Sequence, residues 1–329
     1  MDLDYSLEDY DTQVREAYLR LLPHQERAVG AGKLDWKFAR NPAGKGRIVV
    51  CRSGGQIVGL NAFMAGAFGG GFASYQSMDT IVAPEARGQG VFSKLVSQFY
   101  TETDGDVLYG FPNQSSSPGF FGRLGWQSLG PAPMLVKPLR TGLFLKRISR
   151  LFPDFALPSL LPTNADISPI TRFGSEVARV WDGFSQRGAV QFALRRDSGF
   201  LNWRLFDHPL ADYKAWTFEQ SAFAASCIEE KHGGRIGYIM DAFGDDAGVG
   251  HLVTGITREM CKSKADAVFA WVLPHSPNYR AFRNAGFLPL PNRIRPIKLN
   301  LGARALHADG VAPGNVRDWY VSYLDSDTV

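Results

Sequence analysis

MDTIVAPEARGQGVFSKLVSQFY, residues Met78 to Tyr100, is the stretch that decides how this chain folds. It begins as a β-rich run, passes through Pro84 and a short basic glycine loop, and continues in a helical pattern. A helix is predicted because apolar residues recur at spacings that place them on one face and leave the opposite face polar. The apolar stripe comprises Val91, Phe92, Leu95, Val96, Phe99 and Tyr100. The stretch therefore predicts a strand, a loop and a helix in succession.

The loop before this helix has the composition of an anion-binding site. Arg87, Gly88, Gln89 and Gly90 place two residues without a Cβ where the first helical turn leaves backbone N–H groups unpaired. These donors and the positive end of the helix dipole favour a phosphate. No carboxylate lies between Arg87 and Tyr100 to oppose one. A glycine pair alone is also consistent with an ordinary cap or tight turn, so the preceding strand supplies the necessary context.

Together the strand, the R-G-Q-G loop and the helix resemble the GNAT acetyltransferase superfamily, whose pyrophosphate loop follows the pattern Q/R-x-x-G-x-G/A. Arg87, Gly90 and Phe92 occupy the three defined positions, and Phe92 departs from the pattern because the family has a small residue there. The resemblance implies acetyl-CoA or another acyl-CoA as co-substrate, and it requires no metal. It also implies a set of cofactor-binding residues: Ile81, Val82, Arg87, Gly88, Gln89, Gly90, Val91, Phe92 and Asn113.

The resemblance implies catalytic roles as well. A backbone N–H on the central strand, near Ile81 or Val82, would polarise the thioester carbonyl. Asp79, on the same strand, is the candidate general base, and an ordinary strand-end carboxylate is an equally good interpretation of it. The family often has a proton-donating Tyr four residues before the glycine that closes the next helical segment, here Gly125. That position is Phe121, which has no proton to donate.

Several further residues are open to two interpretations. Asn113 either contacts the cofactor arm, as the resemblance implies, or is a turn residue after Pro112. His208 either faces the cleft or is a surface or capping residue. Three arginines in the second half either hold an anionic acceptor or form a solvated face: Arg195, Arg196 and Arg204.

The second half of the chain repeats the first. LDWKFARNP at residues 34–42 recurs as LNWRLFDHP at residues 201–209, with Leu, Trp, a basic residue and Pro at the same spacing. The strand, proline turn, helix and glycine of residues 106–126 have a counterpart at residues 267–287. The repeats predict an α/β fold (α+β, with mixed sheets) in which two GNAT-like units stand in tandem.

The second unit is expected to be degenerate. Gly248 and Gly250 precede its second helix without an accompanying Arg or Lys, and Asp245 and Asp246 would repel a diphosphate. We therefore expect an N-terminal acyl-CoA-binding catalytic domain at residues 1–140, a linker at 141–165, and a degenerate C-terminal GNAT-like domain at 166–329.

Bulk properties agree with this interpretation. A chain of 329 residues has the length of two domains, and 45% hydrophobic with 21% charged residues is typical of globular proteins. A net charge of +4 carried on dispersed basic residues does not favour nucleic acid. Cys51, Cys227 and Cys261 fit neither a zinc nor a disulfide pattern. No signal or membrane-spanning run occurs, so we expect a cytoplasmic protein.

Local patterns add three expectations. The spacing of apolar residues predicts a helix from Asp11 to Leu22, ended by Pro23. A hairpin is predicted around Ser53-Gly54-Gly55. The basic and apolar segment at residues 143–162 either docks onto a neighbouring domain or associates weakly with a membrane surface.

We thus expect an N-acyltransferase that moves an acetyl or other acyl group from acyl-CoA to the amine of a small molecule, such as an amino sugar or a related metabolite. One alternative is an aminoacyl-tRNA-dependent transferase of the kind that builds peptidoglycan bridges. Such proteins need no CoA loop, so the loop from Arg87 to Gly90 favours acyl-CoA. Another alternative is a non-catalytic acyl-CoA-binding protein of the same fold, which Phe92 and Phe121 keep open.

Overall fold

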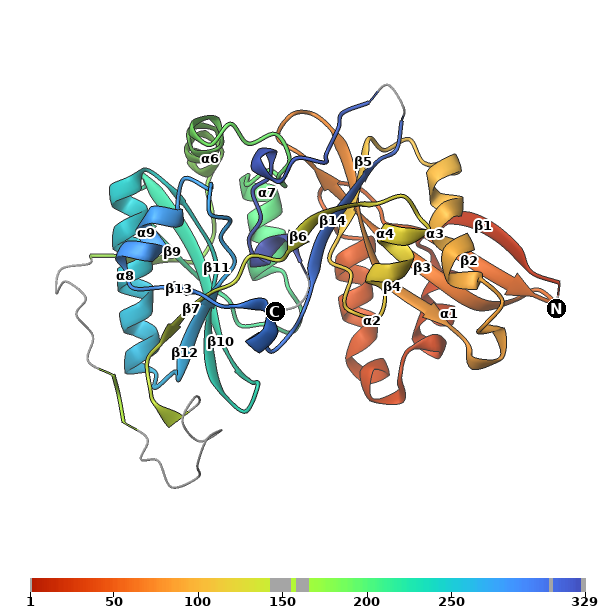
Figure 1. Ribbon diagram of the computed structural model, residues 1–329, viewed down its shortest axis with the longest axis horizontal. Helices are drawn as coiled ribbons and strands as arrows, with labels where there is room; N and C mark the ends of the chain where they lie inside the picture. The colour runs from red at the N-terminus through yellow and green to blue at the C-terminus, as the bar shows by residue number, and fades with distance from the viewer. Residues whose placement is uncertain (1, 143–154, 158–165, 308–309, 327–329) are drawn as a thin grey trace. The chain divides into compact units, whose positions relative to one another are not determined.

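The structure is a computed structural model that describes residues 2–142, 155–157, 166–307 and 310–326 (Figure 1). The described residues form two compact units, each drawn from several parts of the sequence. Unit 1 lies within Met1–Pro131, Asp207–Leu210 and Leu299–Val316, and unit 2 within Ala132–Phe206, Ala211–Lys298 and Arg317–Val329. Across the described residues each unit contains one seven-stranded mixed sheet with helices packed on it. The predicted fold class is confirmed.

The sheet of unit 1 begins as an antiparallel meander. In spatial order its strands are β1 (Asp4–Asp9), β2 (Arg47–Ser53), β3 (Gln56–Ala67), β4 (Ala73–Val82), β5 (Val107–Gly110), β14 (Asn300–Ala305) and β6 (Gln127–Pro131). β4 and β5 pair in parallel, and the other neighbours pair antiparallel. The predicted hairpin is present between β2 and β3. Gly54 and Gly55 form its turn with φ angles of 55° and 81°, which a two-residue turn between twisted strands requires.

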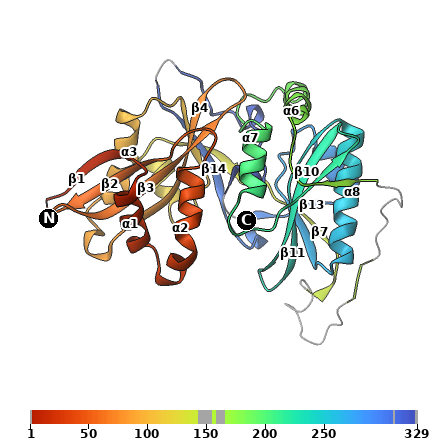
Figure 2. The ribbon, with the colours of Figure 1, turned by 180° about the vertical axis from the view of Figure 1, so that it is seen from behind.

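Helices cover both faces of this sheet. α1 (Thr12–Leu21) and α2 (His24–Phe38) lie on one face, and α3 (Val91–Glu102) and α4 (Ser117–Gly122) lie on the other (Figures 1 and 2). α1 matches the predicted helix and is capped by the Asp11 carboxylate, which accepts a hydrogen bond from the N–H of Val14. The predicted apolar stripe supplies the buried face of α3: Val91, Leu95, Val96 and Phe99 are each at most 2% exposed.

The sheet of unit 2 repeats this plan. Its strands in spatial order are β13 (Leu288–Pro289), β7 (Leu135–Pro138), β12 (Ala267–Ala270), β11 (Gly234–Gly244), β10 (Ala222–Lys231), β9 (Lys214–Phe218) and β8 (Ser168–Ile170). Its helices include α6 (Glu176–Arg187), α7 (Ser198–Leu201), which continues as a π-helical turn at Asn202–Phe206, α8 (Asp246–Lys262) and α9 (Tyr279–Asn284). β11 and β12 pair in parallel as β4 and β5 do. The two sheets are compatible with the predicted tandem arrangement.

One equivalent position in each sheet is filled crosswise, which we call a strand exchange: β7, which follows β6 of unit 1, lies between β12 and β13, and β14, which follows β13 of unit 2, lies between β5 and β6. After β6 the chain enters unit 2, where β7 pairs with β12 and β13. After β13 it returns to unit 1, where β14 pairs with β5 and β6. Residues 132–140 therefore belong to unit 2 and residues 299–316 to unit 1. The compact units differ for this reason from the contiguous domains 1–140 and 166–329. Of the expected linker 141–165, residues 143–154 and 158–165 lie outside the described residues.

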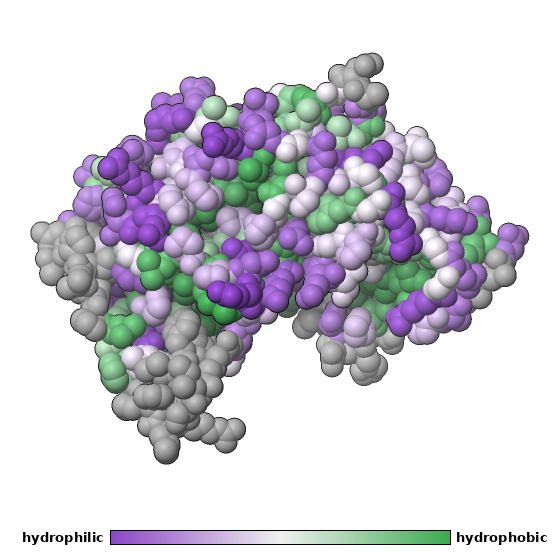
Figure 3. Space-filling model, in the orientation of Figure 1, coloured by the Kyte–Doolittle hydropathy of each residue, from purple (hydrophilic) through white to green (hydrophobic). Residues whose placement is uncertain are grey.

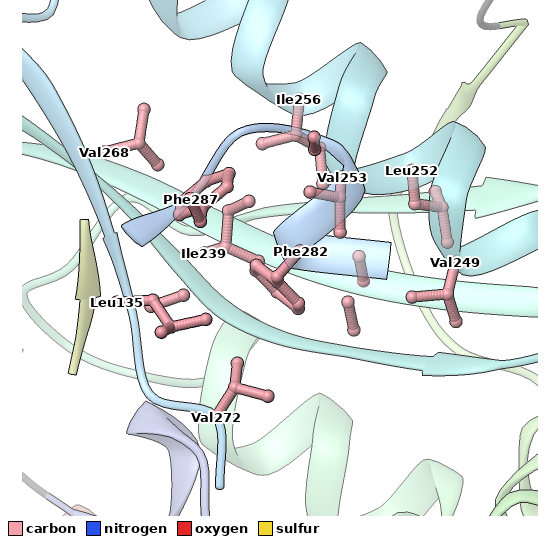
Figure 4. Packing of buried hydrophobic residues seen from close by; sticks show 14 of the residues in the cluster. Leu135, Ile239, Val249, Leu252, Val253, Ile256, Val268, Val272, Phe282 and Phe287 are labelled. Carbon is pink, nitrogen blue, oxygen red and sulfur yellow. The ribbon is translucent and has the colours of Figure 1, made fainter. Parts of the chain in front are cut away.

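The exchanged strand β7 is part of the hydrophobic core of unit 2. Figure 4 shows Leu135 of β7 in the same cluster as Val253 of α8, Val268 of β12 and Phe282 of α9. All four side chains are at most 2% exposed. Burying an aliphatic or aromatic side chain of this size contributes roughly 1.5–3 kcal/mol. β7 therefore contributes to the stability of unit 2 through its hydrophobic core.

The described residues contain no helix that is long and apolar enough to cross a membrane. The face drawn in Figure 3 mixes hydrophilic and hydrophobic residues over its surface.

We expect residues 1–140, expressed alone, to lose the cooperative thermal transition of the full chain. This fragment lacks β14, so β5 and β6 would each have a row of backbone groups without a partner. Circular dichroism melts measure the effect. As a control, residues 1–131 joined through a flexible linker to residues 299–316 retain β14 and should unfold cooperatively. An equally sharp transition in the 1–140 fragment would show that the exchanged strand is dispensable.

Candidate functional site

A β-bulge interrupts β4 at Asp79. The register of β3 and β4 breaks between the pair Ala62–Met78 and the pair Leu60–Ile81, so Asn61 stands opposite two residues of β4. Asp79 has a φ of 43°, in the left-handed region that residues with a Cβ rarely adopt. Asn61 is fully buried, and its Nδ2 donates to the carbonyl of Met78 at 2.8 Å and to Oγ1 of Thr80 at 2.9 Å. These bonds hold the bulge in place.

A cleft opens beside the bulge because β4 and β5 diverge. The two strands pair only from Ser74–Val107 to Gln76–Tyr109, after which β5 ends at Gly110 and β4 continues to Val82. The cleft has a volume of about 760 Å³. Its walls are the second half of β4, the loop and first turn before and in α3, the chain after β5, and α4. The divergence of the parallel strands β4 and β5 thus creates the cleft.

The glycine loop lies at the mouth of this cleft. Gly88 and Gly90 have φ angles of 77° and 75°, so only residues that tolerate the left-handed region fit there. Gly90 is the N-cap of α3 and provides no side chain to cap the helix, and the first turn contains no acidic residue. The N–H groups of that turn and the positive helix end therefore face a space suited to an anion. Arg87 and Arg123, both exposed, also line the cleft.

Asp79 lies in the cleft wall and is held by two helices. Its Oδ2 accepts a hydrogen bond from the hydroxyl of Tyr18 in α1, at 2.7 Å, and pairs with Nζ of Lys37 in α2, at 3.3 Å. The Lys37 side chain is 3% exposed, whereas that of Asp79 is 35% exposed. The carboxylate is therefore anchored on the face of α1 and α2 while it remains accessible from the cleft.

The two candidate N–H donors on β4 point to opposite edges of the strand. The N–H of Ala83 donates to the carbonyl of Val58 in β3 at 2.8 Å. Because successive N–H groups of an extended strand alternate between its edges, the N–H of Ile81 points to β3 and that of Val82 points to the edge that β5 has left. Val82 lines the cleft. The geometry thus favours Val82 over Ile81 as a carbonyl-polarising donor.

Asn113 has the contacts of a turn residue and also lines the cleft. Its Oδ1 accepts hydrogen bonds from the N–H groups of Ser115, at 2.9 Å, and Ser116, at 3.1 Å, just before α4. It is exposed and belongs to the cleft wall. The two interpretations offered by the sequence are therefore compatible at this residue, since the bonded oxygen leaves the amide nitrogen to contact a ligand.

The two phenylalanines that depart from the family pattern occupy different places. The ring of Phe92 lies in the cleft wall, packed edge-on against Phe120 at 5.4 Å, and a Cβ on Gly119 would come within 2.7 Å of it. Phe92 thus packs toward α4. The ring of Phe121 packs against Gly302 of β14, where a Cβ would lie 2.7 Å from it, and it is not part of the cleft wall.

No tyrosine belongs to the cleft wall within the described part of the chain. Tyr100 lies behind the wall residue Trp126, whose indole N–H donates to the Tyr100 hydroxyl at 2.9 Å. That hydroxyl in turn donates to the carbonyl of Leu124. Burial raises the pKa of Tyr100 to about 12, although the bond from Trp126 opposes the shift. Tyr100 is therefore a structural phenol and does not replace the missing acid at Phe121.

Unit 2 has the same split between strands, but it is filled by the chain itself. β11 pairs with β12 only over Ile236–Ile239 and continues to Gly244. The segment Trp319–Asp325, each residue of which is at most 3% exposed, packs there. Tyr320 donates to Asp241, and the ring of Tyr323 stacks on Trp271 at 4.7 Å. The space that is open in unit 1 is occupied in unit 2.

The helix end of unit 2 is also closed to an anion. Asp245 is the N-cap of α8, and its carboxylate accepts the N–H of Gly248 at 2.8 Å. Gly248 and Gly250, expected in a loop before this helix, lie inside α8, which begins at Asp246. The expectation was wrong because Asp245 starts the helix earlier, and Gly248 serves close packing, since a Cβ there would lie 2.7 Å from that of Ala222.

Two of the three arginines considered as acceptor ligands are core residues. Arg196 is fully buried and donates to the carboxylates of Asp241, at 2.9 Å, and Asp325, at 2.7 Å. Burial raises the pKa of Asp241 in spite of this partner. Arg204 is 3% exposed and donates to the carbonyl of Leu324 at 3.2 Å. Both therefore fix the C-terminal segment, and Arg195 alone is exposed.

His208 fits the capping interpretation. Its Nδ1 accepts the N–H of Leu210 at 3.2 Å, and its ring packs edge-on against Trp36 at 4.4 Å. It is not part of the cleft wall. Among the described residues, no group of three or more His, Cys, Asp or Glu side chains could hold a metal ion.

Sequence reasoning missed several residues of this site. Lys37 lies in the repeated L-x-W-K/R motif, so its recurrence was a signal for a buried cation. Tyr18 was assigned to the apolar face of a helix, and nothing in its spacing reveals that its hydroxyl reaches Asp79. Asn61 and Arg123 carry no pattern that separates them from other polar residues.

One family model matches most of the first unit. Residues 6–129 match the family model described as an acetyltransferase (GNAT) domain. No curated protein matches the chain in sequence.

Solved structures share the fold over most of the chain. A GCN5-related N-acetyltransferase from Anabaena variabilis superposes with a TM-score of 0.62 at 12% identity, over 92% of this chain and 73% of that one. A second, from Kribbella flavida, gives 0.59 at 14% identity, over 92% and 72%. A putative acetyltransferase from Pyrococcus horikoshii gives 0.56 at 8% identity, over 97% and 93%. Residues 6–129 thus match the GNAT acetyltransferase family model, and along most of its length the chain shares its fold with the GCN5-related N-acetyltransferases.

Proposed function

We propose that this protein is an N-acyltransferase that transfers an acetyl or other acyl group from acyl-CoA to the amine of a small molecule, such as an amino sugar or a related metabolite. One observation carries the proposal. The uncapped glycine end of α3 opens into a cleft between diverged strands, and an anchored carboxylate lies in the wall of the same cleft. The match of residues 6–129 to the GNAT acetyltransferase family model supports acyl transfer in general.

The residues of the loop fit the diphosphate of CoA. Arg87, Gly88, Gln89 and Gly90 precede a helix end whose N–H groups no side chain caps. Anions bind such ends through the N–H groups and the helix dipole together. Val91 and Phe92 would contribute backbone N–H groups from the first turn. The exposed guanidinium of Arg123 adds positive charge to the cleft wall.

The remaining contacts would fall to β4 and to the chain after β5. Val82 presents an N–H toward the cleft, where it would polarise a thioester carbonyl and stabilise negative charge on its oxygen. The Asn113 amide nitrogen would contact the cofactor arm. Acyl-CoA supplies the activated acyl group when bound, and no metal is needed for this chemistry.

Asp79 is the proposed general base. The acceptor nitrogen forms the new C–N bond as the C–S bond breaks, the sulfur keeps the electron pair, and the proton released by the nitrogen passes to the Asp79 carboxylate, directly or through a water. A thiol with a pKa near 8.5 gives a fair leaving thiolate at neutral pH, so the reaction does not require an acid at Phe121.

A non-catalytic acyl-CoA-binding protein is the second candidate. The observation that favours it is the lack of a tyrosine in the described cleft wall, together with the packing of Phe121 against β14. A thiol-release assay with acetyl-CoA and a panel of glucosamine, spermidine and lysine separates the two candidates. Amine-dependent release supports the transferase, whereas binding of CoA with no release supports the second candidate. We also retain the expectation of a cytoplasmic protein, which the three free cysteines support.

Gly90→Asp is expected to weaken CoA binding by at least about tenfold, because it places a negative charge where the diphosphate would lie and caps the donors that would hold it. Isothermal titration calorimetry measures the change. Gly90→Asn is the matched control: it tolerates the φ of 75° as well as Asp does, but carries no charge, so it should bind more tightly than the Asp variant. Gly250→Asp in α8 controls for the added charge elsewhere. Unchanged affinity in Gly90→Asp would place the diphosphate outside this loop.

The same titration should give one CoA per chain. Unit 2 offers no second site of this kind, since Asp245 caps the end of α8 and the segment Trp319–Asp325 fills the split beside β11. A fitted stoichiometry of two would contradict the assignment of unit 2 as degenerate.

Asp79→Asn should lower turnover by roughly 10²–10⁴-fold, the usual cost of losing a general base, while CoA affinity stays unchanged. Turnover is measured by thiol release with acetyl-CoA and the best amine of the panel. Phe121→Tyr should change turnover little, because its ring packs against Gly302 and not in the cleft wall. Near-native turnover of Asp79→Asn across the pH range would assign the base to another residue.

A further inference from the structure

Two buried donors converge on one oxygen of Asp79. The Tyr18 hydroxyl and the Lys37 ammonium both contact Oδ2, at 2.7 and 3.3 Å. Tyr18 is fully buried and the Lys37 side chain is 3% exposed. Within the described residues, no hydrogen bond is formed to Oδ1. The carboxylate is thus bonded on one side only, and that side faces α1 and α2.

The buried ammonium of Lys37 carries a desolvation cost that other interactions must offset. Taking a charged group out of water is costly unless an opposite charge and hydrogen bonds compensate. Asp79 contributes to this compensation for Lys37, but replacing a buried ion pair by well-packed apolar side chains is often neutral or stabilising. The pair is therefore better explained by what it does to the carboxylate than by stability alone.

The pair fixes the orientation of a group that otherwise turns freely. The terminal torsion of an Asp side chain has a broad energy minimum, so an isolated carboxylate can rotate. Two donors on Oδ2 remove that freedom, and the bulge held by Asn61 fixes the backbone from which the side chain projects. Oδ1 then has one position, and Asp79 is a cleft-wall residue.

Unit 2 provides an internal comparison. Asp241 follows Met240 in β11 as Asp79 follows Met78 in β4, and it also receives a tyrosine hydroxyl and a buried cation, from Tyr320 and Arg196. There the Tyr320 hydroxyl and the N–H of Ala242 donate to Oδ1 while Arg196 donates to Oδ2, and the side chain is 1% exposed. In the unit whose split is filled, both oxygens are bonded. In the unit whose cleft is open, one oxygen is left available.

We propose that Tyr18 and Lys37 are positioning residues for acyl transfer: they hold Oδ2 of Asp79 so that Oδ1 is presented to the acceptor amine. This inference rests on the proposed role of Asp79 as base. It places the acceptor amine beside Oδ1, in the cleft whose wall includes Asp79.

Single and double variants test the proposal. Tyr18→Phe and Lys37→Met should each lower kcat by roughly 10- to 100-fold, the cost of a misplaced catalytic group, with KM for acetyl-CoA and the affinity for CoA unchanged. Lys37→Arg keeps a cation and should recover part of the loss. In the Asp79→Asn background Tyr18→Phe should have no further effect, because a residue that acts only through Asp79 has nothing left to position.

Tyr10→Phe is the matched control. The Tyr10 hydroxyl donates to Asp35 of α2 at 2.7 Å, which is the same bond at the same length, away from the cleft wall. Its removal should leave kcat unchanged, and melting temperatures of all variants report on general destabilisation. Full activity of Tyr18→Phe and Lys37→Met beside an inactive Asp79→Asn would overturn the positioning role and leave the base in place. An additive loss in the double variant would also overturn it. An active Asp79→Asn would instead refute the proposed base.

Discussion

β4 and β5 share three residue pairs and then separate, and the cleft of unit 1 depends on that loss of pairing. Backbone groups of a sheet normally find partners on both sides. Here β14 pairs with the edge of β5 that faces away from β4. Beyond Gln76, β4 no longer pairs with β5, and this stretch of β4 lines the cleft. The bulge at Asp79 lies on this same unpaired stretch. A strand that is bonded on one side only can therefore present both an N–H, at Val82, and a carboxylate, at Asp79, to the cleft.

The two units show how one framework is either kept open or closed. Both have a central strand with a Met-Asp step, a parallel neighbour that diverges, and a helix that follows the strand. In unit 1 the helix begins at a glycine with no cap, and in unit 2 it begins at Asp245, which caps itself. The buried cluster of Arg196, Asp241 and Asp325 ties the C-terminal segment into unit 2. The space that is an open cleft in unit 1 is therefore part of a packed core in unit 2.

The sequence was informative about features that depend on residues close together in the chain. The stripe of α3, the glycine loop and the hairpin at Gly54-Gly55 follow from spacing and from backbone conformations that glycine favours, and all three are present. The repeated Trp motif revealed two units because each Trp is a core residue with fixed surroundings, as Trp36 and Trp203 are. The features that the sequence did not predict depend on contacts between segments that are far apart in the chain. The short strands β7 and β14 have no sequence pattern that predicts which strands they pair with. The hydrogen bond from Tyr18 to Asp79 joins residues that are 61 positions apart. Arg196 was assigned to a ligand or the surface because its two carboxylate partners lie 45 and 129 residues away.

The exchanged strands also set an order of events for a chain emerging from the ribosome. β6 ends at Pro131, but the strand that separates it from β5 begins only at Asn300. At typical rates of synthesis, that interval lasts on the order of 10–30 s. Throughout it the first unit has two open sheet edges, each able to pair with a neighbouring chain. The N-terminal unit is made first and completed last, so its survival during synthesis depends on protection of β5 and β6 until residue 305 is available.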